Sequence, residues 1–232
     1  MMRSKQFRDR REAGRQLAAK LAAYAESPDV LVLGLPRGGV PVAYEVAVGL
    51  GVPLDIILVR KLGVPGEREL AMGAIASGGV RLLNPRVIQA FSIPDYIVDE
   101  VALEETRVLT RRERLYRGDF PEPVLRGRTL IIVDDGIATG STMRAALQAV
   151  GRQEPKRTIV AVPVIAADTW RSLKSEADEV VCLLAPEDFL SVGSFYSDFP
   201  QTTDEEIQFL LDLAWHRASA RDEGSTKPRE TS

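Results

Sequence analysis

The chain has 232 residues, 45% of them hydrophobic, and it can bury one substantial core. Its formal net charge of −3 argues against a general nucleic-acid binder, which usually has a basic surface. The single cysteine excludes an internal disulfide framework, and no apolar run is long enough to span a membrane. Because the basic N-terminus lacks the apolar stretch of a signal peptide, we expect a cytoplasmic protein.

Helical and strand-like patterns alternate from the start of the chain. Leucines at helical spacing predict a helix over residues 5–25, and the apolar run at 29–35 is typical of a buried strand. Residues 38–51 have a helical pattern that ends in glycines, and residues 53–60 form a second buried run.

The middle of the chain is less regular. Residues 61–70 are polar and contain a proline and two glycines, so we expect a loop there. Residues 71–84 indicate a hairpin that turns at Gly78 and Gly79. A helix of mixed charge is expected at about 95–117. Its charges fit a solvated face, and an interface in a homo-oligomer is the alternative.

The second half returns to regular alternation. Buried strands are expected at 129–135, 157–165 and 179–184, and helices lie between them. This alternation predicts an α/β fold: a doubly wound, mainly parallel central sheet with helices on both faces. A last helix precedes a polar tail at 218–232, which we expect to be disordered.

Chemically useful residues follow three of the expected strands, at the edge where ligands bind in such sheets. Pro-Arg-Gly-Gly at 36–39 follows the first strand, and an Arg-Lys pair at 60–61 follows the second. Two aspartates at 134–135 follow the third strand and lead into a turn of small residues at 136–142.

The turn at 136–142 has the features of a phosphate site. It opens a helix, where unpaired amides and the helix dipole attract anions, and its small residues allow close approach. The two acids would repel a bare polyphosphate, but they would accept hydrogen bonds from vicinal sugar hydroxyls. The pattern therefore predicts a sugar phosphate, with its phosphate on the turn and its ring over the acids. A capped helix behind surface acids is the alternative.

These residues resemble a known family. The stretch LIIVDDGIATGST resembles the signature of type I phosphoribosyltransferases, which use 5-phosphoribosyl 1-pyrophosphate (PRPP). The resemblance covers most of the chain and implies the type I phosphoribosyltransferase fold with a small hood. It implies a single domain over 1–217, with a core of about 28–83 and 126–185. The hood would come from the N-terminus, about 84–125 and 186–217.

The resemblance also implies roles for individual residues. Asp134 and Asp135 would hold the ribose hydroxyls and would contact a metal mostly indirectly, through those hydroxyls or water. A non-proline cis peptide would join Pro36 to Arg37. The PRPP-binding residues would be Asp134, Asp135, Gly136, Ala138, Thr139, Gly140, Ser141 and Thr142. Pyrophosphate would be bound by Arg37, Gly38, Gly39 and Lys61, and the catalytic residues would be Lys61, Arg37 and Asp135.

The acceptor pocket is the least determined part of the resemblance. Several purine-salvage members have an acid where this chain has Ala138, so a catalytic carboxylate is missing at that place. Tyr196 and Phe199 precede the last helix and are expected either to wall the acceptor pocket or to pack that helix onto the sheet.

The implied activity is transfer of the phosphoribosyl group from PRPP to a nitrogenous base or related acceptor, with release of pyrophosphate, as in nucleotide metabolism. Mg²⁺ would be the cofactor. A non-catalytic PRPP sensor on the same fold is the alternative. Either way, we expect small-molecule partners and neither nucleic acid nor a membrane.

Overall fold

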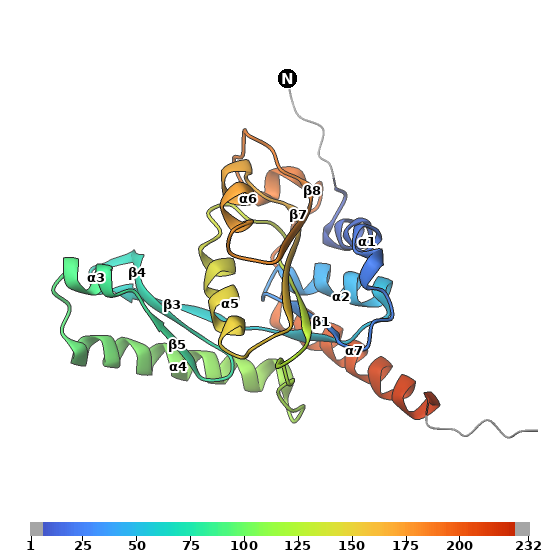
Figure 1. The fold of residues 1–232 in the computed structure, drawn as a ribbon, viewed down its shortest axis with the longest axis horizontal. Helices are drawn as coiled ribbons and strands as arrows, with labels where there is room; N and C mark the ends of the chain where they lie inside the picture. The colour runs from blue at the N-terminus through green and yellow to red at the C-terminus, as the bar shows by residue number, and fades with distance from the viewer. Residues whose placement is uncertain (1–6, 226–232) are drawn as a thin grey trace, which may run out of the picture.

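The computed structural model describes residues 7–225, except the side chains of 68–69 and 218–225. Five parallel strands form a central sheet in the order β2-β1-β6-β7-β8 (Figure 1). Their bounds are β1 Val30–Gly34, β2 Leu54–Ile56, β6 Thr129–Val133, β7 Arg157–Val164 and β8 Glu179–Leu184. Gly34 is in register with both Ile56 and Val133, so the carboxyl ends of the three adjacent strands are level.

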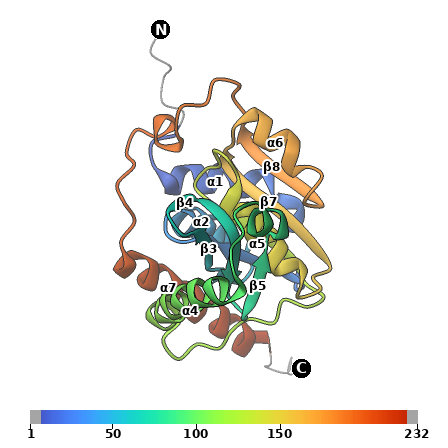
Figure 2. The ribbon, with the colours of Figure 1, turned by 90° about the vertical axis from the view of Figure 1, so that its left-hand side faces the viewer.

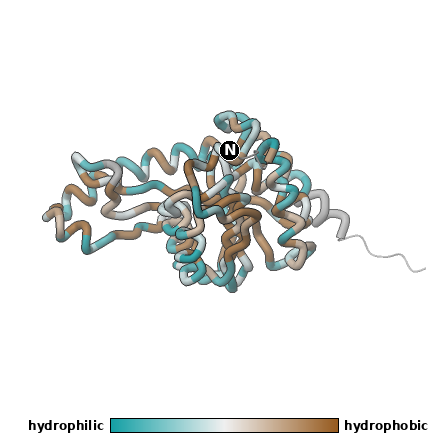
Figure 3. Tube along the Cα trace, turned by 90° about the horizontal axis from the view of Figure 1, so that it is seen from above, coloured by the Kyte–Doolittle hydropathy of each residue, from teal (hydrophilic) through white to brown (hydrophobic). Residues whose placement is uncertain are grey.

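Alternate residues of the central strands face opposite helical layers. Val30 and Val32 pack into one cluster of buried side chains, and Leu31 and Leu33 pack into the other. Both faces are buried, which explains the continuous apolar runs and the hydrophobic centre of the trace (Figure 3). Helices α1 (Arg10–Lys20), α2 (Gly39–Leu50) and α7 (Asp204–Ser225) cover the first face, and α5 (Ser141–Gly151) and α6 (Ala167–Leu173) cover the second. The predicted fold class is confirmed.

A second, antiparallel sheet with the order β3-β4-β5 projects from the central sheet together with two helices (Figures 1 and 2). We call this projection, residues 59–117, the arm. Its elements are β3 Val59–Val64, β4 Glu67–Ala76, β5 Val80–Leu83, α3 Pro85–Ala90 and α4 Asp95–Arg117.

The prediction of a loop at 61–70 is wrong, because these residues belong to a hairpin formed by β3 and β4. β3 and β4 are joined by a tight turn in which Gly66 has a φ of 84°. Leu62 and Val64 are buried, but the surrounding glycines and the proline conceal this alternation in the sequence. The second hairpin, from β4 to β5, turns through Gly78 and Gly79 as predicted, and both glycines have positive φ.

Two other elements are shorter than expected. The N-terminal helix begins only at Arg10, because the Asp9 side chain caps it by accepting the Glu12 amide at 2.7 Å. The expected strand at 53–60 divides into β2 and the start of β3, which belong to different sheets. Two short 3₁₀ helices complete the fold, η1 Ala22–Tyr24 and η2 Val192–Phe195.

The C-terminal helix is longer than expected. α7 continues to Ser225, so the expected disordered tail is helical from 218 to 225, and its remainder, 226–232, lies outside the described residues. Among the described residues, no helix has both the length and the apolar character that crossing a bilayer requires.

Candidate functional site

The loop after β1 and the acids after β6 touch each other. The Leu35 amide donates to the Val133 carbonyl at 2.9 Å, which extends the contact between these strands past their ends. A Cβ on Gly38 would lie 1.9 Å from Asp135 Oδ2, and one on Gly39 would lie 2.7 Å from the Val133 carbonyl. Only glycine fits at these two positions. The structure thus brings together two of the predicted segments.

Asp134 and Asp135 have different surroundings. Asp134 Oδ1 accepts the Asp135 amide at 2.8 Å, and we find no cation paired with Asp134 in residues 7–225. Burial raises the pKa of Asp134 well above its usual value, and the charge of Asp135 raises it further. Burial also raises the pKa of Asp135, and Arg10 acts in the opposite direction. When both acids are ionised, they carry two negative charges against one nearby arginine.

Arg10 is a residue of this site that the sequence patterns did not predict. Its Nε donates to Asp135 Oδ2 at 2.8 Å, and its Nη1 donates to the Pro200 carbonyl at 2.6 Å. The guanidinium carbon lies 3.7 Å from the centre of the Phe199 ring. The Arg10 and Asp135 side chains are 11% and 14% exposed. Helix α1 and the segment before α7 therefore hold Asp135 from two sides.

Tyr196 does not form the wall of an open pocket. Its exposed fraction is 0%, its hydroxyl donates to the Asp135 carbonyl at 2.6 Å, and its ring stacks on Phe199 at 4.9 Å. Phe7 pairs with Tyr196 through a short parallel bridge. Tyr196 is buried in a small cluster with Phe7, Val164 and Phe195, so its ring is covered by protein, but none of these contacts comes from α7. Phe199 is half-buried and lies against Arg10.

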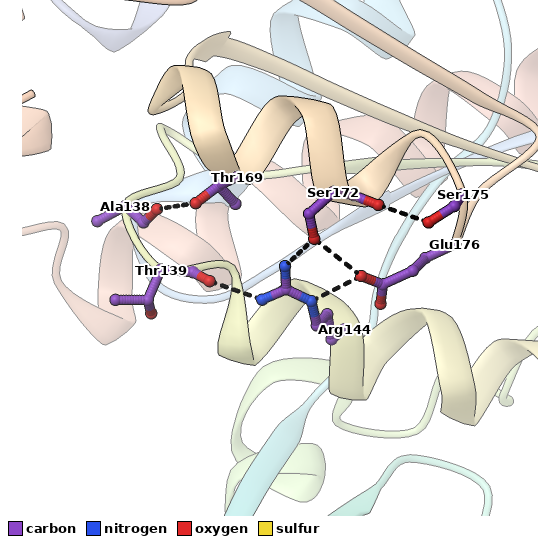
Figure 4. Close-up of polar contacts among 7 residues, drawn as sticks. All are labelled: Ala138, Thr139, Arg144, Thr169, Ser172, Ser175 and Glu176. Carbon is purple, nitrogen blue, oxygen red and sulfur yellow. Dashed lines mark hydrogen bonds and ion pairs between the residues drawn. The ribbon is translucent and has the colours of Figure 1, made fainter. Parts of the chain in front are cut away.

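The turn at 136–142 is fixed through its carbonyl groups (Figure 4). Thr169 Oγ1 donates to the Ala138 carbonyl at 2.6 Å, and Arg144 Nη1 donates to the Thr139 carbonyl at 2.7 Å. Arg144 is itself held by Glu176, at 2.8 Å from Nε. These side chains come from α5 and from α6 and its C-terminal end. Both carbonyls therefore accept hydrogen bonds from side chains of the protein.

The amides of the same turn are not used by the protein. Within the described part of the chain, the backbone N–H groups of residues 138–142 donate no hydrogen bond. Gly140 has a φ of 76° and precedes the first residue of α5, Ser141. Thr139 Oγ1 lies 3.4 Å from Ser141 Oγ. Free amides and two hydroxyls at a helix N-terminus are the features that the sequence pattern predicted for a phosphate site here.

Two of the predicted cations have no ion-pair partner in the part of the chain that the structure describes. The peptide between Pro36 and Arg37 is cis, as predicted. Arg37 is half-buried, and Lys61 is exposed on β3 opposite Ala74, not on a loop. Neither side chain forms an ion pair with another described residue, whereas the neighbouring Arg60 donates to Glu105 at 2.6 Å.

The acids do not form a complete metal cage. In residues 7–225 there is no group of three or more His, Cys, Asp or Glu side chains placed to hold an ion. Mg²⁺ is commonly held by one or two carboxylates together with substrate phosphates and water. Asp134 and Asp135 fit the protein's share of such a site.

The missed residues left only weak signals in the sequence. Asp9 and Glu12 have the spacing of a helix start, which would have placed Arg10 in the first turn of α1. The direction of the Arg10 side chain depends on Asp135, 125 residues away. No local sequence pattern marks Thr169 or Arg144. Thr169 contacts the backbone carbonyl of Ala138, which is distant in sequence, and Arg144 contacts the carbonyl of Thr139 in the preceding loop.

Comparison with known proteins identifies the family of the chain. A family model for the phosphoribosyl transferase domain matches residues 5–200. The crystal structure of TT1426 from Thermus thermophilus superposes with a TM-score of 0.80 at 44% identity, covering 90% of this chain and 99% of that one.

A Mycobacterium tuberculosis protein, found in strains CDC 1551 and H37Rv under the provisional name of a phosphoribosyl transferase, is 46% identical over 213 residues. The match covers 92% of this chain and 48% of the relative, so the chain spans about half the length of the curated relatives it matches. On the family model and the similarity to TT1426, the chain belongs to the phosphoribosyl transferase domain family.

Proposed function

We propose that the chain transfers the 5-phosphoribosyl group of PRPP to a nitrogen atom of a base or related acceptor and releases pyrophosphate. One observation carries the proposal: within the described residues, a turn whose amides donate no hydrogen bond adjoins a partly buried acid pair in which Asp134 has no cation partner. The amides suit the 5-phosphate, and the acids suit the ribose hydroxyls. A structural site would have balanced these groups within the protein.

The acids act on the sugar. Asp134 and Asp135 accept hydrogen bonds from the ribose hydroxyls, and charged acceptors form stronger hydrogen bonds than neutral ones. In the reaction, the anomeric carbon loses the pyrophosphate oxygen with its electron pair, and the acceptor nitrogen supplies the electron pair of the new C–N bond. The acceptor then loses its proton. Asp135 favours the positive charge that develops on the ribose ring.

The cations act on the leaving group. Arg37 and Lys61 have no partner among the described side chains, so both are free to meet the negative charge that grows on pyrophosphate. Gly38 and Gly39 let the pyrophosphate approach the backbone closely. When bound, Mg²⁺ would add charge neutralisation and orientation of the pyrophosphate. Asp134 and Asp135 are the carboxylates that would help to hold this Mg²⁺, through the ribose hydroxyls or water.

A PRPP sensor is the second candidate, because residue 138 is alanine and supplies no carboxylate near the acceptor. A sensor would bind PRPP through the same turn and acids but would have no leaving group to stabilise. Kinetics with the Lys61→Ala variant separates the two functions.

The experiment measures PRPP affinity by titration calorimetry and pyrophosphate release with a panel of purines, pyrimidines and simple analogues, with and without Mg²⁺. We expect Mg²⁺-dependent release with at least one acceptor. Lys61→Ala should lower kcat about 100-fold and change the PRPP dissociation constant only slightly, since its contact matters as pyrophosphate leaves. Arg86→Ala, on the same arm and also exposed, is the control and should change neither.

Tight PRPP binding without release across the whole panel would favour the sensor. Failure to bind PRPP at all would contradict both candidates.

A further inference from the structure

Backbone hydrogen bonds hold the two ends of the turn at 136–142. Near its start, the Ile137 carbonyl accepts the Ala166 amide at 2.9 Å. Near its end, where α5 begins, the Gly140 carbonyl accepts the Arg144 amide at 2.9 Å. Both ends are therefore fixed by main-chain contacts, which side-chain substitutions would leave in place.

Side chains hold the middle of the turn (Figure 4). The Ala138 carbonyl accepts the Thr169 hydroxyl, and the Thr139 carbonyl accepts an N–H of Arg144. In the part of the chain that the structure describes, no backbone amide donates to either carbonyl. Both side chains pack closely on the turn, since a Cβ on Gly140 would lie 2.8 Å from Thr169 Cγ2 and 3.1 Å from Arg144 Nη1. The two middle peptides therefore depend on Thr169 and Arg144.

These two hydrogen bonds also decide where the amides of the turn point. A trans peptide carries its C=O and its N–H on opposite sides of one plane. The bond to the Ala138 carbonyl therefore directs the Thr139 amide away from α6, and the bond to the Thr139 carbonyl directs the Gly140 amide away from Arg144. If either peptide turned over, a carbonyl oxygen would face the phosphate in place of an N–H group, and attraction would become repulsion.

The role of Arg144 differs from that of a phosphate-binding cation. Its Nε donates to Glu176 at 2.8 Å, and its Nη2 donates to the Ser172 hydroxyl, so its charge is already paired with a carboxylate (Figure 4). Thr169 is buried and carries no charge. Both residues act on the turn through its carbonyl groups.

We infer that Thr169 and Arg144 are positioning residues for the phosphate. Thr169 sets the direction of the Thr139 amide, and Arg144 sets the direction of the Gly140 amide. The inference rests on the proposed function, since it takes this turn to be the place where the 5-phosphate of PRPP binds.

The test follows the backbone amide signals of the full chain by NMR while ribose 5-phosphate is added. In the wild type, we expect the signals of Thr139 and Gly140 to move, because both amides face the phosphate. Thr169→Val keeps the shape of the side chain but removes the hydroxyl, so the Thr139 signal should lose most of its movement while the Gly140 signal keeps it. Arg144→Met should have the reverse effect. Signals from the rest of the chain show that each variant is folded.

Titration calorimetry with PRPP gives a second readout. Each variant should bind PRPP about tenfold more weakly, as expected for loss of one hydrogen bond to a charged group. Thr169→Ser restores the hydroxyl and should recover the affinity of the wild type. Arg152→Met is the matched control for Arg144→Met, because Arg152 is exposed at the far end of α5, and it should leave the affinity unchanged.

If the signals and the affinity of Thr169→Val and Arg144→Met match those of the wild type, the inference is wrong and the proposed function stands. The expected variant responses in a chain that transfers to no acceptor would support the inference and count against the proposed activity. A wild-type turn whose amide signals respond to neither ribose 5-phosphate nor PRPP would contradict both.

Discussion

Two regions of the molecule place an arginine against aspartate, and they balance charge differently. Where the arm joins the central sheet, Asp55 of β2 meets Arg117 of α4; Nη1 lies 2.8 Å from Oδ1, and Nη2 donates to the Ile56 carbonyl at 3.0 Å. These side chains are 7% and 6% exposed, and one acid meets one base. At the carboxyl end of β6, Arg10 meets Asp135, but Asp134 beside it has no cation in the described chain.

The difference separates a structural ion pair from the site that we propose for PRPP. A buried pair that holds a fold is neutralised within the protein, because an uncompensated buried charge is costly. Asp134 is partly buried, its pKa is raised by burial, and it has no such partner among the described residues, which is expected where a ligand donates hydrogen bonds to the carboxylate. Three substitutions test this contrast.

The largest effect is expected at the structural pair. Asp55→Ala leaves Arg117 buried without its partner, which typically costs about 3–5 kcal/mol. We therefore expect the melting temperature to fall by about 10 °C in a chain of this size. Calorimetry or urea unfolding measures the change.

The control for this prediction replaces both partners. Asp55→Leu with Arg117→Met removes both charges and should be less destabilised than Asp55→Ala, because no unpaired charge remains. A double variant less stable than the single one would show that the pair holds the arm by more than charge balance.

An intermediate effect is expected at Arg10. Arg10→Gln removes a charged hydrogen bond to Asp135 and frees that carboxylate to move. The PRPP dissociation constant should rise about tenfold, equivalent to about 1.4 kcal/mol. Titration calorimetry measures this dissociation constant. Arg10→Lys keeps the charge but loses the planar guanidinium group, so its dissociation constant should lie between those of the wild type and Arg10→Gln.

Arg11→Gln is the matched control, since Arg11 is the next residue and is exposed. If Arg10→Gln binds PRPP as the wild type does, Arg10 is a purely structural residue and Asp135 does not depend on it.

The smallest effect is a gain in stability at Asp134. Burial raises the pKa of Asp134 in the folded chain, so the folded state binds its proton more tightly than the unfolded state does. This contribution is present below the unfolded pKa of about 3.9 and is lost as pH rises through the raised value. Asp134→Asn should therefore match the wild type near pH 4 and melt about 2–4 °C higher at pH 7, roughly 1 kcal/mol.

Asparagine keeps the oxygen that accepts the Asp135 amide, so the comparison isolates the charge. Asp212→Asn, at an exposed position of α7, should show no such pH-dependent difference. Equal melting temperatures of the wild type and Asp134→Asn at pH 7 would show that the charge of Asp134 does not destabilise the folded chain, so Asp134 would not differ from Asp55 in this respect.

The parts of the fold that local patterns determine were predictable from the sequence. Continuous apolar runs identify strands buried on both faces, and the acids and the turn after β6 adjoin in sequence. The hairpin of β3 and β4 was missed because Gly63, Pro65 and Gly66 weaken its strand pattern.

Long-range contacts of the site were not predictable. The ion pair of Arg10 with Asp135 and the bond from Thr169 to the Ala138 carbonyl join residues that are far apart in sequence. The sequence around Tyr196 is irregular and fits a residue in a pocket wall as well as a residue packed in the interior. Only the direction of the tyrosine ring in the folded chain distinguishes the two.

The role of Asp134 in PRPP binding can be measured as the shift in melting temperature on adding PRPP and Mg²⁺, compared between the wild type and Asp134→Asn. We expect a clear upward shift for the wild type, because a ligand that binds only the folded chain stabilises it. Asp134→Asn, although more stable alone at pH 7, is expected to lose most of that shift. An equal shift in both proteins would show that the charge of Asp134 has no role in binding.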